Sequence, residues 1–162
     1  MSLRIGEILV RQGLLDSEQV EAVLAAQRER GKPFGAIAEE LFNLDPEHVE
    51  SAWLMQYEDN ADRVDPVATP PTAEALRVVS RRQAWQFRVL PLRRDEHGDI
   101  VLCTNPEHLH RALRFAANCL AEPAVVHLTE AHRLTQALAS HYPIAGFDSE
   151  ELSGSGGAAR CA

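Results

Sequence analysis

The chain has 162 residues, of which 45% are hydrophobic and 25% charged, a balance typical of a globular protein. Its formal net charge of -8 argues against general binding to DNA, RNA or anionic membranes, because phosphate groups would be repelled. No apolar run approaches the roughly 18 residues that a membrane span needs, and no signal peptide is recognisable. We therefore expect a cytoplasmic protein without direct membrane insertion.

The first third of the chain contains an internal repeat, in which residues 33–56 repeat the pattern of residues 4–27. Identical pairs include Gly6 and Gly35, Ile8 and Ile37, Leu15 and Leu44, Asp16 and Asp45, Val20 and Val49, and Gln27 and Gln56. Apolar residues recur at helical spacing in each copy. Each copy is therefore predicted to be a short helix, a tight connection and a longer helix.

Capping residues place the ends of these helices. Gly13 and Gly31 tolerate left-handed backbone angles and are predicted to end the two helices of the first copy. Asp16 and Asp45 are good N-caps for the longer helix of each copy. Pro46 then stands at a first helical position, where its missing N–H costs nothing.

The rest of the chain predicts a linker, a mixed unit and a tail. Residues 58–71 are polar and contain prolines, as a linker would. The expected elements are a helix over 72–86, a strand over 87–92, a turn at 95–98, a strand over 100–103, a helix opening at 104–106, a strand over 124–128 and a helix over 129–142. This order suggests an α+β unit with helices on one face of a small sheet.

The predicted fold class is therefore α+β, with a tandem helical-hairpin subdomain followed by a small α/β-sheet subdomain. The predicted boundaries are 1–57 for the helical repeat, 58–71 for the linker, 72–145 for the α+β unit and 146–162 for a flexible tail rich in Gly and Ser.

Residue patterns that carry catalysis are absent from the sequence. It contains no phosphate-binding P-loop and no G-x-S-x-G nucleophile motif. His108 and His110 are two residues apart and cannot bind one ion from a regular helix. We therefore predict no catalytic residue, no metal site and no cofactor, and expect that the chain is not an enzyme.

Residues 4–27, RIGEILVRQGLLDSEQVEAVLAAQ, closely match the pattern R-L-G-x-x-L-V-x-x-G-L-L-x-x-x-x-L-x-x-x-L-x-x-Q. This pattern resembles the N-terminal (MshEN) domain of type II secretion and type IV pilus assembly ATPases, where two copies are separated by five residues. Residues 28–32 supply the same spacing here. Segments 88–92, 105–106 and 111–115 also resemble later parts of that domain. Without a P-loop, the resemblance implies the domain standing alone without the ATPase.

In one branch of this family the doubled motif binds cyclic di-GMP, one half of the ligand to each copy. The resemblance implies ligand-binding roles for Arg4, Ile5, Gly6, Leu9, Val10, Gly13, Leu14, Leu24 and Gln27 in the first copy, and for Gly35 and Gln56 in the second. An arginine can stack on guanine or pair with phosphate, and a glutamine can bond a base edge. Glycine allows close approach of the backbone.

The second copy departs from the motif. Pro33 stands at the position of the arginine, Glu39 at an apolar position and Phe42 at the inner glycine, while Trp53 replaces a leucine. The first function that we expect is therefore a regulatory adaptor that docks to a protein partner of a secretion or pilus assembly. The alternative is a cyclic di-GMP sensor that uses residues 4–27 and 33–56.

Overall fold

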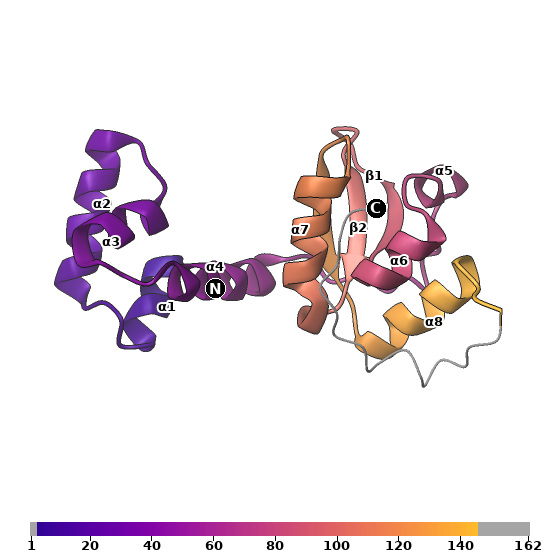
Figure 1. The fold of residues 1–162 in the computed structure, drawn as a ribbon, viewed down its shortest axis with the longest axis horizontal. Helices are drawn as coiled ribbons and strands as arrows, with labels where there is room; N and C mark the ends of the chain where they lie inside the picture. Colours follow the sequence, from indigo (N-terminus) through magenta and orange to yellow (C-terminus); the bar gives the residue numbers. More distant parts are fainter. Residues whose placement is uncertain (1–2, 146–162) are drawn as a thin grey trace. The chain divides into compact units, whose positions relative to one another are not determined.

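The computed structural model describes residues 3–145 and contains two compact units, the first ending at Asn60 and the second beginning at Ala61 (Figure 1). The first unit is helical and the second holds a three-stranded sheet with helices, which confirms the predicted α+β class. The predicted tail, 146–162, lies outside the described residues. Among the helices of residues 3–145, none combines the length and the apolar character that a membrane crossing requires.

The first unit consists of the two predicted helical hairpins. Its helices are α1 (Ile5–Arg11), α2 (Ser17–Arg30), α3 (Phe34–Phe42) and α4 (Pro46–Asn60). The short helix α1 of the first copy contacts the long helix α4 of the second, and α2 contacts α3 in the same reciprocal way. Exchanging the two copies maps one of these contacts onto the other, so the hairpins pack against one another as the repeat predicted.

Local capping explains where the helices begin and end. The Asp16 carboxylate accepts a hydrogen bond from the Gln19 N–H at 2.8 Å, and the Gln19 side chain accepts one from the Asp16 N–H at 2.8 Å. This reciprocal capping box starts α2. Gly31, with φ of 65°, ends α2, and its N–H donates to the Gln27 carbonyl at 2.9 Å. The predicted caps of the first copy are therefore confirmed.

The two copies differ where the short helix ends. In the first copy, Gly13 follows α1 with φ of 72°. In the second, α3 continues through Phe42 and the positive φ, 51°, falls on Asn43. Asparagine is one of the few residues with a side chain that tolerates this conformation. The replacement of the inner glycine by Phe42 is thus accommodated by moving the left-handed residue one position along the chain.

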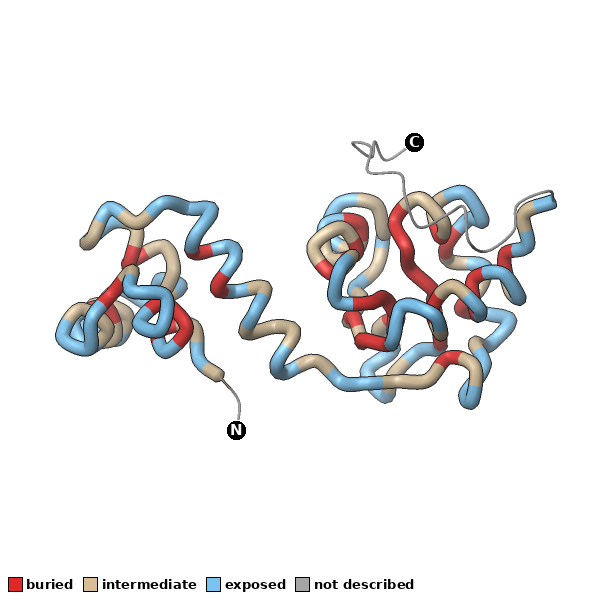
Figure 2. Tube along the Cα trace, turned by 90° about the horizontal axis from the view of Figure 1, so that it is seen from below, coloured by how far each residue is buried: buried red, intermediate tan, exposed pale blue. Residues whose placement is uncertain are grey.

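Both copies contribute to one core. Ile8 and Ile37, which occupy equivalent positions, are 2% and 0% exposed, and Val23 and Ala52, both 0% exposed, belong to the same core. Buried stretches of the chain are red in Figure 2. Full burial of such an aliphatic side chain stabilises a fold by about 1.5–3 kcal/mol. The repeat therefore supplies one core to which both hairpins contribute.

The second unit is built around a short mixed sheet. Its elements are α5 (Ala73–Leu76), α6 (Arg81–Phe87), β1 (Leu90–Arg94), β2 (Ile100–Thr104), the 3-10 helix η1 (Pro106–His108), α7 (Leu109–Cys119), β3 (Ala124–Leu128) and α8 (Ala131–His141). The strand order is β1-β2-β3, with β1 antiparallel and β3 parallel to β2. All five residues of β2 are buried. Because alternate residues point to opposite faces, both faces of β2 are covered, and the expected single covered face is wrong.

The helix expected over 72–86 is broken in two. Thr72 caps the first piece, since its hydroxyl accepts a hydrogen bond from the Ala75 N–H at 3.2 Å. The break comes before Ser80, whose hydroxyl accepts from the Gln83 N–H at 3.2 Å while the Gln83 side chain accepts from the Ser80 N–H at 3.1 Å. A second capping box therefore starts α6 as a new helix.

The strand expected over 87–92 begins later, at Leu90. Phe87 is the last residue of α6, and Arg88 follows with a left-handed φ of 54° and donates its N–H to the Ala84 carbonyl. The hairpin itself is confirmed, because the Gly98 N–H donates to the Asp95 carbonyl at 3.1 Å and β1 pairs with β2. Arginine gives no sequence signal for a left-handed helix end, which is why the strand was placed too early.

Residues 58–71, which the sequence assigns to a linker, are divided between the two units. Residues 58–60 complete α4. Arg63 forms a parallel bridge with Leu128 at the end of β3, and the Val64 N–H donates to the Leu128 carbonyl at 2.9 Å. The Asp65 carboxylate accepts from the Val67 N–H at 2.9 Å. The segment after Asn60 is therefore held by the second unit rather than extended as a free connection.

Candidate ligand-binding groove

A groove of about 840 Å³ lies between α1 and the beginning of α2 in the first copy of the repeat. Its lining residues are Leu3, Arg4, Gly6, Glu7, Val10, Arg11, Ser17, Val20 and Glu21. Arg4, Glu7 and Arg11 are spaced three and four residues apart, so they follow one face of α1. The charged residues of this face thus line the groove.

Arg4 stands at the N-terminal end of α1. Its backbone is extended, with φ of -95° and ψ of 149°, and its N–H donates to Oε2 of Glu7 at 3.0 Å. This hydrogen bond fixes the point from which the Arg4 side chain leaves the helix. The side chain is exposed, so its guanidinium is accessible from the groove.

The groove presents both signs of charge. Arg4 and Arg11 supply two guanidinium groups, which can form paired hydrogen bonds to phosphate oxygens. Glu7 and Glu21 supply two carboxylates, which accept hydrogen bonds from N–H groups. A ligand that matches this set carries phosphate together with N–H donors, as a guanine nucleotide does on N1 and N2 of its base.

Three of the residues implied by the motif resemblance line this groove, namely Arg4, Gly6 and Val10. Leu9 does not, because it is 0% exposed and belongs to the core. Ile5 and Leu14 also pack against that core. Gly13, Leu24 and Gln27 of the first copy and Gly35 and Gln56 of the second are not among the residues that line the groove.

The motif glycines have a packing role of their own. A Cβ on Gly6 would lie 3.1 Å from Val20 Cγ1, and a Cβ on Gly35 would lie 2.5 Å from Val49 Cγ1. These two contacts are equivalent under the repeat, since glycine meets valine in both copies. The glycines thus let each short helix approach its long helix closely. The presence of glycine at this position in the second copy is therefore explained without a ligand.

Sequence reasoning missed Leu3 and Val20 as groove residues, together with the polar residues Glu7, Arg11, Ser17 and Glu21. The motif leaves the four polar positions unspecified, so the resemblance could not select them. Their helical spacing from Arg4 and Val20 was the available signal. Elsewhere, within residues 3–145, no group of three or more His, Cys, Asp or Glu side chains is placed to hold a metal ion.

Comparison with known proteins places these observations in a family. The family model of the MshEN domain matches residues 60–147. The solved structure described as "Structure of MshE with cdg" is similar over 86% of this chain and 99% of that chain, with 18% sequence identity and a TM-score of 0.47.

No curated protein matches the sequence. The family match begins at the last residue of α4 and covers the described part of the second unit, so it is independent of the doubled motif at residues 4–56. Two separate parts of the sequence thus indicate the same domain. Because the matched residues are more than half of the chain, the chain belongs to the MshEN domain family.

Proposed function

We propose that this MshEN domain is a non-catalytic regulatory module that binds cyclic di-GMP through the groove between α1 and α2. The observation that carries the proposal is the presence of the motif residues Arg4, Gly6 and Val10 in one groove with Arg11. In this proposal Arg4 and Arg11 contact the phosphates. Val10, which is 36% exposed, contacts a base.

The carboxylates of the groove give the proposal a base preference. Glu7 and Glu21 accept hydrogen bonds and can pair with the N1–H and N2–H groups of guanine. Adenine has no N1–H to offer, and its exocyclic amine stands at a different position. The groove is therefore proposed to favour cyclic di-GMP over cyclic di-AMP.

Calorimetric titration of the full chain with cyclic di-GMP tests the site. We expect saturable binding, and a loss of affinity of about 5- to 150-fold in Arg4→Ala, since a stacked or bidentate base or phosphate contact contributes about 1–3 kcal/mol. Arg28→Ala is the matched control, because Arg28 is an exposed arginine of α2 outside the groove. Absence of heat at high micromolar ligand, or equal affinity in Arg4→Ala, would remove the proposal.

A second candidate function is docking to a protein partner of a secretion or pilus assembly. The observation that favours it is the exposure of Trp53, 44%, in the second copy, where the motif has a leucine. Trp53 and Tyr57 lie one turn apart on α4 with ring centroids 5.6 Å apart. Exposed aromatic side chains are typical of protein interfaces. The divergence of the second copy thus offers a surface for a partner.

Substitution separates the two functions. Trp53→Ala is expected to leave the affinity for cyclic di-GMP unchanged and to weaken capture of assembly proteins of the same cell. Arg4→Ala is expected to weaken binding of cyclic di-GMP and to leave capture of assembly proteins unchanged. If both variants lose the protein partner and both keep their affinity for cyclic di-GMP, the first unit serves docking alone and the dinucleotide binds elsewhere.

A further inference from the structure

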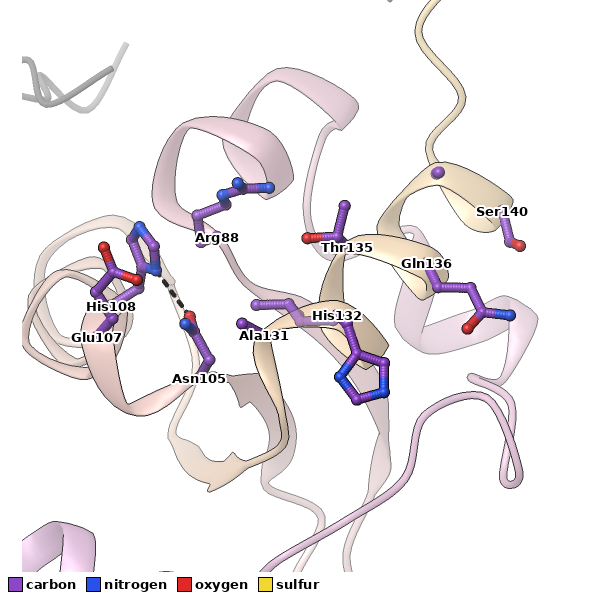
Figure 3. A pocket seen from close by; sticks show the side chains of 11 residues that line it. Arg88, Asn105, Glu107, His108, Ala131, His132, Thr135, Gln136 and Ser140 are labelled. Atoms are coloured by element: carbon purple, nitrogen blue, oxygen red, sulfur yellow. Dashed lines mark hydrogen bonds between the residues drawn. The ribbon is translucent and has the colours of Figure 1, made fainter. Parts of the chain in front are cut away.

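A second pocket, in the second unit, lies between η1 and α8 and has a volume of about 640 Å³ (Figure 3). Arg88, Asn105, Glu107 and His108 line one side, and Ala131, His132, Leu134, Thr135, Gln136, Ala139 and Ser140 of α8 line the other. Nothing in the groove of the first unit takes part in it. The pocket combines a cation, a carboxylate, two imidazoles, amides, hydroxyls and an apolar wall.

Arg88 is held in this pocket by the fold. Its left-handed backbone ends α6, and its carbonyl accepts a hydrogen bond from the buried Thr104 hydroxyl at 2.7 Å. Its guanidinium carbon lies 5.5 Å from the centroid of the Trp85 ring, and the Trp85 Nε1–H donates to the Tyr142 carbonyl at 2.7 Å. Arg88 is only 7% exposed, so the protein maintains a cation in a place largely shielded from water.

Polar groups next to Arg88 are fixed as well. Asn105 is 4% exposed, and its Oδ1 lies 2.7 Å from Nδ1 of His108 (Figure 3). A carboxamide oxygen can only accept, so Nδ1 of His108 carries the proton of this hydrogen bond. The Nδ2 group of Asn105 is a donor suited to an anion beside Arg88.

The electrostatics of the pocket favour an anion. Burial lowers the pKa of Arg88, while Glu107 raises it and Arg111 lowers it. An arginine nevertheless stays charged in proteins. A shielded cation gains most from an anion with which it can form paired hydrogen bonds. Glu107 also lines the pocket, at the start of η1, where it is exposed.

We propose that this pocket is a binding site for a small organic oxyanion, a carboxylate or a phosphate, with Arg88 as its anion-binding group. Asn105 and the hydroxyls of Thr135 and Ser140 supply further hydrogen bonds. Leu134 and Ala139 contact the organic part of the ligand. The site is separate from the proposed cyclic di-GMP groove, and its failure or success leaves that proposal untouched.

NMR titration of the full chain with phenyl phosphate and with benzoate tests the site, because the two probes share a ring and differ in the oxyanion. We expect saturable shifts of backbone amides in residues 105–108 and 131–140 with at least one of them, and none with benzyl alcohol. Saturation by one probe alone identifies which oxyanion the site takes. Lack of saturable shifts with both oxyanions overturns the proposal.

Two variants with opposite expected effects on affinity keep the test independent of folding defects. Arg88→Gln is expected to lose at least about tenfold in affinity, since charge-assisted hydrogen bonds contribute about 1.5–3 kcal/mol. Arg77→Gln, an exposed arginine of the same unit outside the pocket, is its matched control. Glu107→Gln removes a nearby negative charge and is expected to tighten binding by about threefold at low salt, which no unfolding could produce. Unchanged affinity in both Arg88→Gln and Glu107→Gln overturns the assignment.

Discussion

Two histidines of the second unit, His108 and His127, favour their neutral form. Burial lowers the pKa of His127 on β3, although Asp62, whose Oδ2 lies 3.6 Å from Nε2, partly opposes the shift. Burial also lowers the pKa of His108. A group whose folded pKa is depressed in this way binds fewer protons in the folded state than in the unfolded one. Folding stability therefore rises with pH through the range in which the unfolded histidine titrates, near about pH 6.5.

This linkage predicts that the second unit becomes less stable on acidification, at pH values well above those at which carboxylates titrate. The urea midpoint of the second unit is expected to fall between about pH 7.5 and about pH 5.5, a window above the usual carboxyl pKa values. His127→Gln removes one of the two groups and is expected to reduce that fall. A midpoint that rises on acidification in the unmodified chain contradicts the shielding of these rings.

At the level of the helices, the close approach of Gly35 to Val49 predicts that one added methyl group lowers the stability of the fold. A Cβ at Gly35 would meet Val49 Cγ1 at 2.5 Å, which forces a backbone or side-chain shift. Such overpacking costs about 1–3 kcal/mol, against a gain of about 1 kcal/mol in helix propensity. We expect Gly35→Ala to lower the free energy of unfolding by up to about 2 kcal/mol.

The equivalent substitution in the first copy is its control. A Cβ at Gly6 meets Val20 at 3.1 Å and the Phe34 ring at 3.3 Å, distances that small movements can relieve, so Gly6→Ala costs less. Adding Val49→Ala to Gly35→Ala is expected to recover part of the loss, a coupling that a double-mutant cycle in urea measures. Equal stability of Gly35→Ala and the unmodified chain would show that the clash costs no more than the gain in helix propensity.

The elements that sequence predicted well are those whose signals are local. Asp16 and Gly31 act on their own helix, so their roles could be read without the rest of the fold. Ser80 was missed because the helical pattern of 72–86 continues across the break. The capping box that starts a new helix there forms only when the Gln83 side chain folds back to accept a hydrogen bond from the Ser80 N–H. Arg88 was missed because its left-handed conformation comes from the surrounding fold.

The candidate sites follow the same division. Arg4 was predicted because it belongs to a motif that is continuous in the sequence. Leu9 of the same motif is buried in the core instead, and an apolar residue gives no sign of which role it takes. The pocket around Arg88 joins residues that are far apart along the chain, from α6 to α8. Only the folded sheet brings those segments together, so no spacing in the sequence could have indicated it.

For the whole chain, we expect residues 1–60 and the unit that begins at Ala61 to unfold separately. The helical unit has its own core around Val23 and Ile37, and the second unit has its own around β2. A unit of about 60 residues buries a smaller fraction of its surface than a larger one and is correspondingly marginal. The first unit is therefore expected to unfold at lower urea.

The two tryptophans allow each unit to be followed by fluorescence, because Trp53 lies on α4 and Trp85 on α6. Trp53→Phe leaves Trp85 to report on the second unit, and Trp85→Phe leaves Trp53 to report on the first. A fragment of residues 61–147 should then give the same Trp85 midpoint as the full chain carrying Trp53→Phe, since no residue of its core is removed. The second unit depends on the helical repeat if the fragment fails to fold. The same conclusion follows if its free energy of unfolding is lower by more than about 1 kcal/mol, which is a large fraction of the total stability.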